Sequence, residues 1–399
     1  MIELSKRITE LAESATLQMA ALGRELADKG IDVITLSLGE PDFDTPEHIR
    51  DAAKQAIDEG YTHYTPVPGY TDVREAIAAK FKRDNGLEYS PNQIVVSTGA
   101  KQSIANVVFC LVNPGDEVLL PIPYWVSYAA QIELAEGKIV EVPTSMDNEF
   151  KVTPEALAAA ITPKTKLIIF SSPCNPTGSL YSQDELEALA RVIAAHDNLY
   201  VVSDEIYEHI NYVGKHQSLA QFDFIKERVI TVNGLSKGFA MTGWRLGFIA
   251  APLAIAKACT KMQGQFTSAT CSIAQRACIA AMLSEKSAET IEEMRIEFKR
   301  RRDIMFDLLQ DLPGFKTYLP KGAFYFFPDV TAYFGKSFNG TVIRNADDLC
   351  MYLLNEAHVS VVTGSAFGNP NCIRISYAVS EDKLREAVRR MQLYLSKLV

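Results

Sequence analysis

The fold of this chain is decided by the stretch Val229-Ile230-Thr231-Val232-Asn233-Gly234-Leu235-Ser236-Lys237-Gly238-Phe239-Ala240-Met241-Thr242-Gly243-Trp244-Arg245-Leu246-Gly247-Phe248-Ile249. It begins and ends in a short apolar run, and such runs are typical of strands that are buried on both faces of a sheet. Between the runs, Lys237 stands eight residues before Arg245 in a small, apolar setting. A lysine amine can form a Schiff base with a carbonyl group, and an arginine can bind a phosphate. The stretch therefore indicates a buried sheet beside a site for a phosphorylated carbonyl compound.

Similar apolar runs recur from about residue 90 to residue 250 and alternate with helical patterns. One helical pattern covers residues 184–195 and opens with a capping box, in which Ser182 is followed by Glu185. Strands that alternate with helices predict a large three-layer α/β/α domain with a mostly parallel sheet. The other runs are Ile94-Val95-Val96-Ser97, Val118-Leu119-Leu120, Lys166-Leu167-Ile168-Ile169-Phe170 and Leu199-Tyr200-Val201-Val202.

The last third of the chain has a different pattern, which predicts a smaller α+β domain. A charged helix is expected over residues 288–309, and its run Arg300-Arg301-Arg302 is interpreted as a solvated helix face. Strands are expected at residues 322–328 and 372–377, followed by an amphipathic helix from Glu381. The predicted organisation is an N-terminal arm (1–15), a small domain (16–47 and 290–399) and a large domain (48–289).

Composition narrows the class of protein. The chain has 399 residues, 47% of them hydrophobic, and a net charge of −9, which argues against a nucleic-acid partner. It contains no apolar run of ~18 residues, so no membrane span is expected. The N-terminus lacks the pattern of a secretory signal, and the seven cysteines form no CxxC pair. We therefore expect a reduced, cytoplasmic protein and no metal site.

Pyridoxal phosphate (PLP) is the cofactor that satisfies both residues of the opening stretch. Its pyridine nitrogen also calls for a carboxylate, and its ring oxygen for a hydrogen-bond donor. Asp204 follows the apolar run that ends at Val202, at the strand end where ligands bind in open parallel sheets, and Tyr207 follows three residues later. Taken alone, Asp204 could simply begin a loop or a helix; beside Lys237 it is a candidate partner of the ring nitrogen.

Two further strand ends carry candidate residues. Asn175 lies between two prolines after the run that ends at Phe170, so its amide could be aimed at a ligand. Gly99, Ala100 and Lys101 follow another strand and open a helix, where exposed amides suit a phosphate. The alternatives are a plain Pro/Gly turn in the first case and an ordinary strand-to-helix turn in the second.

An aromatic residue and a second arginine complete the candidate set. Trp125 follows the strand at residues 118–120 and could stack on a pyridine ring, although a core aromatic is the alternative. Arg374 lies among apolar neighbours and needs an anion. A bidentate substrate carboxylate would satisfy it, and so would an internal ion pair.

Taken together, these motifs resemble the class I aminotransferases, which have PLP fold type I, and the resemblance spans essentially the whole chain. Pro-Tyr-Trp-Val-Ser-Tyr at 123–128 and Gly-Ala-Lys-Gln at 99–102 are most similar to the bacterial aspartate aminotransferase subgroup. The other motifs are Gly-Glu-Pro-Asp-Phe-Asp-Thr-Pro at 39–46, Tyr64, Gly69, Asn-Pro-Thr-Gly at 175–178, Asp-Glu-Ile-Tyr at 204–207, Ser236-Lys237, Arg245 and Arg374.

The resemblance implies a role for each candidate residue. Lys237 is implied to hold PLP as a Schiff base and to shuttle the proton, and Asp204 to pair with the pyridinium. Tyr64 is implied to reach the phosphate in the partner subunit's site, which requires a homodimer. Toward the cofactor, the resemblance implies that Tyr207 and Asn175 contact the ring oxygen and that Trp125 covers the ring. The phosphate is implied to be bound by Gly99, Ala100, Lys101 (in the turn that opens the helix), Ser236 and Arg245. Toward the substrate, Arg374 is implied to bind the α-carboxylate, with Gly39, Asn175 and Trp125 nearby, and Lys101 to bind the side-chain carboxylate.

The implied reaction is ping-pong transamination of L-aspartate and 2-oxoglutarate to oxaloacetate and L-glutamate. A prephenate or broad-range aromatic aminotransferase and a PLP β-lyase remain alternatives, because a fold does not decide a reaction. A PLP-sensing transcription regulator is a less favoured alternative, because the chain is acidic and the motifs of the resemblance leave no segment expected to form a DNA-binding domain. Many relatives of this type have a basic residue near the N-terminus, where this chain reads Ala12-Glu13-Ser14-Ala15-Thr16. This departure weakens the prephenate alternative.

Overall fold

The main element of the computed structural model is a seven-stranded sheet with the strand order β2-β8-β7-β6-β5-β3-β4. The structure describes residues 2–399, so Met1 of the predicted arm lies outside the described residues. Neighbouring strands run parallel except β8, which is antiparallel to both β2 and β7. The sheet confirms the predicted fold class. Its strands are β2 (Ile94–Ser97), β3 (Glu117–Pro121), β4 (Lys138–Val142), β5 (Thr165–Ser171), β6 (Tyr200–Asp204), β7 (Val229–Gly234) and β8 (Gly247–Ala250).

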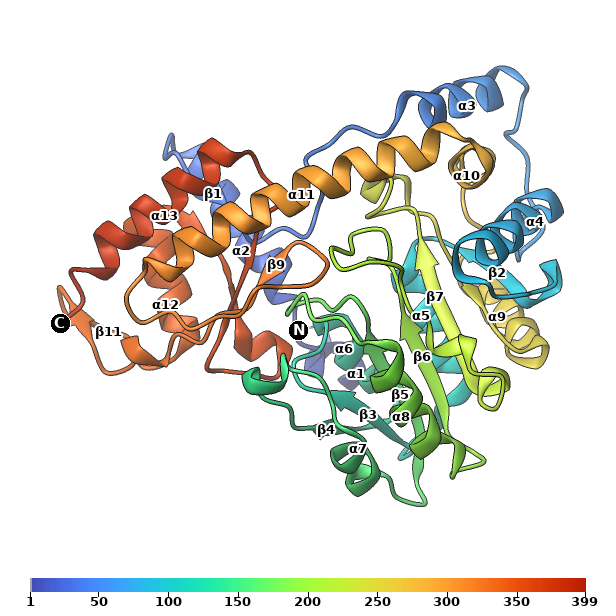
Figure 1. Cartoon of the computed structure of the whole chain (residues 1–399), viewed down its shortest axis with the longest axis horizontal. Coiled ribbons are helices and arrows are strands. Elements are labelled where there is room, and N and C mark those ends of the chain that lie inside the picture. The colour runs from blue at the N-terminus through green and yellow to red at the C-terminus, as the bar shows by residue number, and fades with distance from the viewer. Residues whose placement is uncertain (1) are drawn as a thin grey trace.

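Helices cover both faces of this sheet (Figure 1). On β5, Ile168 and Phe170 pack in one core, whereas Leu167 and Ile169 pack in the other, because successive side chains of a strand point to opposite faces. The first core includes residues of α3 (Glu47–Asp58), α4 (Thr71–Lys80), α8 (Gln183–Ala194) and α10 (Ser272–Leu283). The second includes residues of α5 (Ala100–Leu111), α6 (Val126–Leu134) and α9 (Leu253–Phe266), and α7 (Pro154–Ala160) joins β4 to β5. The capping box of α8 forms as predicted.

A separate core is built mainly from both ends of the chain, and residues from the segment 206–212 join it. Strand β1 (Ile34–Thr35) pairs in parallel with β12 (Val359–Ser360), and β13 (Val362–Thr363), β14 (Ile373–Ser376) and β9 (Tyr325–Phe326) form a small antiparallel sheet. Helix α11 runs from this region to α3 and α10 (Figure 1). The predicted domain boundaries stay a prediction. The other elements here are α2 (Ala15–Asp28), α11 (Lys286–Gln310), β10 (Ser337–Phe338), β11 (Thr341–Val342), α12 (Ala346–Tyr352) and α13 (Glu381–Leu395).

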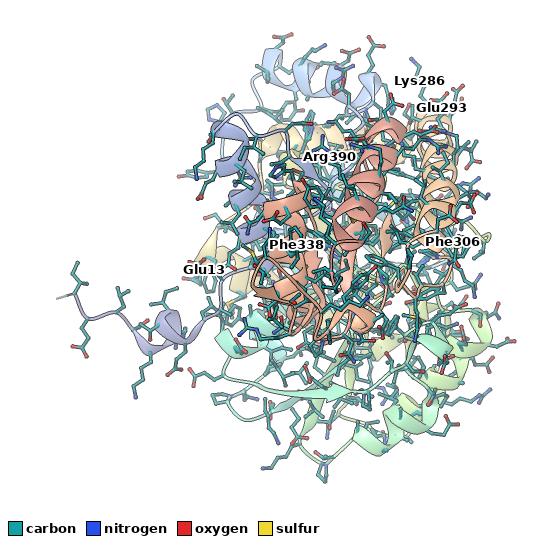
Figure 2. All side chains as sticks on the ribbon, turned by 90° about the vertical axis from the view of Figure 1, so that its left-hand side faces the viewer. Glu13, Lys286, Glu293, Phe306, Phe338 and Arg390 are labelled. Carbon is teal, nitrogen blue, oxygen red and sulfur yellow. The ribbon has the colours of Figure 1, made fainter. Side chains whose placement is uncertain are left out.

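Residues 2–12 extend away from the body of the molecule (Figure 2). Their short helix α1 (Lys6–Glu10) contains no buried residue. None of the helices in residues 2–399 combines the length and the apolar character that crossing a membrane requires.

The interpretation of Arg300-Arg301-Arg302 as a solvated face is wrong for two of the three residues. Arg301 and Arg302 are only 7% and 5% exposed. The Nη1 atom of Arg301 donates to Asp42 at 2.6 Å, and Nη1 of Arg302 donates to the carbonyl of Pro320 at 2.9 Å. Three consecutive residues turn through most of a helical turn and cannot share one face.

The strand expected at residues 322–328 is also shorter than predicted. Only Tyr325 and Phe326 pair with a neighbouring strand. Ala323, just before them, has a φ of +54°, which is incompatible with an extended strand. The apolar pattern of this segment comes from burial of the aromatic side chains rather than from a long ladder.

Candidate active site

The strand ends converge on a cavity of about 300 Å³. Ser171 and Asp204 reach it as the last residues of β5 and β6, and Ala100 reaches it as the first residue of α5. This is the strand edge where ligands bind in open parallel sheets. Of the predicted site residues, the lining contains Gly39, Ala100, Lys101, Trp125, Asn175, Asp204, Tyr207, Ser236, Lys237, Arg245 and Arg374.

Lys237 follows β7 and extends into this cavity. Its Nζ atom donates a hydrogen bond to the backbone carbonyl of Gly39. Burial, together with repulsion by the guanidinium of Arg374, lowers the pKa of Lys237 to about 8. An amine with this pKa is partly neutral near neutral pH, so it can act as a nucleophile or accept a proton.

Asp204 supplies a buried carboxylate at the end of β6. It is 4% exposed, and its Oδ2 atom accepts a hydrogen bond of 2.7 Å from the phenol of Tyr128. Burial raises the pKa of Asp204 to about 6, although the bond from Tyr128 acts in the opposite direction. A buried carboxylate of this kind calls for a cationic partner. Tyr128 lies on α6, three residues after Trp125, and we did not predict it.

Arg374 lies on β14 and is 1% exposed. It donates to Asn175 Oδ1 at 3.0 Å and to the carbonyl of Ser37 at 2.6 Å, so the structure brings two predicted site residues into direct contact. Burial lowers the pKa of its guanidinium. The Nε atom is buried and has no partner among residues 2–399, which leaves a donor for an anionic ligand.

The predicted phosphate turn forms an anion cradle. The α5 helix begins at Ala100, and no hydrogen bond among residues 2–399 uses the amide N–H of Ala100 or Lys101. Gly99 has a φ of +84°, and a Cβ atom on it would lie 2.5 Å from a guanidinium nitrogen of Arg245. Arg245 itself adopts a left-handed φ of +55°, a conformation that costs about 1–2 kcal/mol. The backbone is thus arranged to place a guanidinium beside a free helix N-terminus.

Lys101 and Trp125 lie next to each other at this cavity. The Nζ atom of Lys101 lies 5.1 Å from the centre of the Trp125 ring, within the range of a cation–π contact. Partial burial, followed by repulsion from Arg245, lowers the pKa of Lys101. Its ammonium has no carboxylate partner within 4.0 Å among residues 2–399, which leaves it available to a substrate anion.

Two predicted site residues are not among those that line this cavity: Gly99, which lies directly before Ala100, and Tyr64. The side chain of Tyr64 is fully exposed, with a relative exposure of 101%. Tyr325 is the most prominent residue that sequence reasoning missed. It lines the cavity, and its phenol lies 2.7 Å from that of Tyr207. The aromatic run at 324–327 was a weak signal, because it fits a core equally well.

Comparison with known proteins assigns the family. The family described as aminotransferase class I and II matches residues 31–391. The chain therefore belongs to the class I and II aminotransferases, which are enzymes that use PLP.

Within this family the chain is similar to aspartate aminotransferases. It is 46% identical over 394 residues to the bifunctional aspartate aminotransferase and glutamate/aspartate-prephenate aminotransferase of Petunia hybrida, covering 98% of this chain and 82% of that protein. It is 44% identical over 398 residues to the aspartate aminotransferase of Bacillus subtilis (strain 168), covering 99% and 100%. The crystal structure of the aspartate aminotransferase from Rhizobium meliloti superposes with a TM-score of 0.95 at 40% identity, covering 100% of both chains.

The residues present fit PLP. The unused amides at the start of α5 and the guanidinium against Gly99 suit its phosphate, and the buried carboxylate of Asp204 suits a protonated ring nitrogen. Lys237 offers an amine of lowered pKa to the aldehyde. Each part of the cofactor thus has a chemically matched group on the cavity wall.

Proposed function

We propose that this aminotransferase transfers the amino group of L-aspartate to 2-oxoglutarate, giving oxaloacetate and L-glutamate by a ping-pong mechanism. The observation that supports this choice is the presence of two cations, Arg374 and Lys101, on the wall of one cavity. Aspartate and 2-oxoglutarate each carry two carboxylates, so two cations match both substrates. The activities for which the relatives from Petunia hybrida and Bacillus subtilis are named agree with this substrate class.

The chain's residues would divide the work as follows. When bound, PLP supplies an aldehyde that condenses with amines and a ring that takes up the electron pair left at the substrate's α-carbon. Asp204, ionised above its pKa of about 6, holds a proton at the ring nitrogen. Lys237 Nζ takes the α-proton, and Arg374 with Asn175 orients the α-carboxylate.

The deciding assay uses PLP-loaded protein with L-aspartate and 2-oxoglutarate. We expect stoichiometric oxaloacetate and L-glutamate, and parallel lines in double-reciprocal plots. A β-lyase would leave L-aspartate unchanged, because its β-carboxylate is not a leaving group, and would instead release pyruvate, ammonia and a thiol from an S-substituted cysteine. That pair of results would overturn the proposal. A panel of aromatic amino acids run beside aspartate tests the broad-range alternative.

Prephenate is the second candidate acceptor, since the relative from Petunia hybrida also bears that activity in its name. Near the N-terminus, Ser14, Thr16 and Leu17 border the cavity. None of these three side chains carries a positive charge that could bind the ring carboxylate of prephenate. We therefore expect prephenate to be a poorer acceptor than 2-oxoglutarate. The test is to replace 2-oxoglutarate by prephenate in the assay and to compare the kcat/KM values of the two acceptors. We expect the value for 2-oxoglutarate to be the higher one.

We also propose a homodimer in which Tyr64 completes the partner's site. Its full exposure supports a role outside its own subunit. Mixing chains that carry Tyr64→Ala with chains that carry Lys237→Ala tests this directly. If Tyr64 acts in the partner, the hybrid dimer has one intact site and regains activity; if it acts in its own subunit, the mixture stays as inactive as the separate variants. A cytoplasmic location remains a prediction from the cysteines.

A further inference from the structure

Tyr325 touches three parts of the site without having been assigned any role in it. It is 1% exposed, and its hydroxyl lies 2.7 Å from that of Tyr207. Its ring lies under the guanidinium of Arg374, 4.6 Å from the ring centre. A Cβ atom on Gly39 would come within 2.2 Å of the Tyr325 hydroxyl. One side chain thus contacts the residues expected at the ring oxygen and at the substrate carboxylate, and it fills the space beside Gly39, whose carbonyl accepts from Lys237.

The backbone explains this placement. Tyr325 on β9 is paired with Ser376 on β14, and Arg374 lies two residues before Ser376 on the same strand. Paired residues and their neighbours two positions away project from the same face of an antiparallel sheet, so Tyr325 and Arg374 are diagonal neighbours. The small sheet therefore holds both side chains at a constant separation and presents them together to the cavity.

The direction of the bond between the two phenols follows from hydroxyl chemistry. A phenol has one proton to donate and can also accept. Within residues 2–399 the hydroxyl of Tyr325 is the only hydrogen-bond partner of the Tyr207 hydroxyl. If Tyr207 donated to Tyr325, it would present only lone pairs to the anionic ring oxygen of PLP. If Tyr325 donates, the proton of Tyr207 stays free for that oxygen.

We propose that Tyr325 is a positioning residue, which donates a hydrogen bond to Tyr207 so that Tyr207 donates into the cavity, and whose ring supports Arg374. This inference rests on the proposed use of PLP at this site. A hydroxyl that accepts one bond becomes a stronger donor in the next, so the contact also strengthens the bond from Tyr207 to the ring oxygen.

A spectroscopic titration separates this role from a merely structural one. The absorbance of the bound cofactor changes with pH, and proton loss leaves negative charge on the ring oxygen that Tyr207 stabilises. Tyr325→Phe should raise the apparent pKa of this change by a few tenths of a pH unit, and Tyr207→Phe should raise it more. The double variant should match Tyr207→Phe alone, because Tyr325 acts through Tyr207. An unshifted Tyr325→Phe, or a double variant whose shift is the sum of the single shifts, would overturn the proposal.

The control is Tyr352→Phe, which removes a phenol that donates to the carbonyl of Tyr394 at 2.8 Å. Tyr352 is not among the residues that line the cavity, so its titration should match the parent. If the PLP absorbance of the parent protein does not respond to aspartate, the proposed function is wrong. If the parent responds but Tyr325→Phe has the same apparent pKa as the parent, only the role of Tyr325 is wrong.

Two substitutions test the remaining contacts of Tyr325. Tyr325→Leu removes the ring beneath Arg374 and should weaken succinate binding roughly 10-fold, whereas Tyr325→Phe should leave it unchanged. Gly39→Ala should lower kcat/KM strongly in the parent but less in Tyr325→Phe, where the nearest atom of residue 325 would lie 3.3 Å from the new methyl group. Unchanged succinate binding by Tyr325→Leu, or equal losses from Gly39→Ala in both backgrounds, would remove the corresponding contact from the proposal.

Discussion

A buried ion pair behind the active site provides a quantitative test. The side chains of Lys80 and Glu208 are 2% and 3% exposed and form a direct contact. Glu208 follows Tyr207 in the chain and also accepts hydrogen bonds of 2.9 Å from Asn85 and Asn233. Lys80→Met replaces the ammonium with an apolar group of similar length. The carboxylate of Glu208 is then left buried without its main cationic partner.

The structure allows the cost to be estimated. Removing one partner of a buried ion pair costs about 3–5 kcal/mol, and the two amide donors that remain place this case near the lower end, at about 3 kcal/mol. Burial by itself raises the pKa of Glu208, but the charges of Lys80, His209 and His216 outweigh it and hold the pKa well below its usual range. Without Lys80 we expect burial to dominate and to raise the pKa of Glu208 above its value in the unfolded chain. The folded variant then binds more protons than the unfolded chain, so its deficit in unfolding free energy should shrink as pH falls from 8 to 5.5.

Urea denaturation of the PLP-loaded protein at several pH values measures this deficit. Glu208→Gln should lose a similar free energy of unfolding, and the double variant should lose clearly less than the sum of the two. Lys54→Met, which breaks an exposed pair with Asp51, is the matched control and should change nothing measurable. The reasoning is refuted if Lys80→Met stays within ~0.5 kcal/mol of the parent, the range of ordinary surface substitutions.

Four further outcomes concern the active site. Lys237→Ala should keep the circular dichroism spectrum of the parent and lose turnover by several orders of magnitude; near-parent transamination would contradict the mechanism. The rate at which the cofactor-free parent takes up PLP should rise with pH and reach half its maximum near pH 8, because the neutral amine of Lys237 is the nucleophile; a rate independent of pH between 6 and 10 argues against this. Arg374→Lys should raise the KM for aspartate by roughly 10- to 150-fold, because one charged hydrogen bond contributes about 1.5–3 kcal/mol, and an unchanged KM would contradict its role in binding the α-carboxylate. Lys101→Met should lower kcat/KM for aspartate far more than for alanine, and equal losses for both would show that Lys101 does not bind the side-chain carboxylate.

The strand ends show why so much of this site could be predicted from the sequence. Asp204, Asn175 and the turn at Gly99 each lie at or within a few residues of the end of an apolar run, and a parallel sheet brings such ends to one edge. The chemical type of each side chain then limits what it can bind. Lys237 and Arg245 could be predicted as site residues in the same way, because both lie in the segment that joins two apolar runs.

Other features depended on distance in space rather than on local pattern. Tyr128 and Tyr325 look like core aromatics in the sequence, and only the packing of α6 and β9 against the strand ends turns them toward Asp204 and Tyr207. The burial of Arg301 against Asp42 likewise depends on a segment 259 positions away in the chain.

The sequence by itself determined the α/β architecture, the family and the set of candidate reactive groups, because apolar periodicity and residue chemistry are local properties. The antiparallel direction of β8, the contact between Arg374 and Asn175 and the lowered pKa of Lys237 were decided only by the tertiary structure. These properties arise from burial and from neighbours that are distant in the chain. Charge and hydrogen-bond energies depend on such surroundings, and no stretch of sequence specifies them alone.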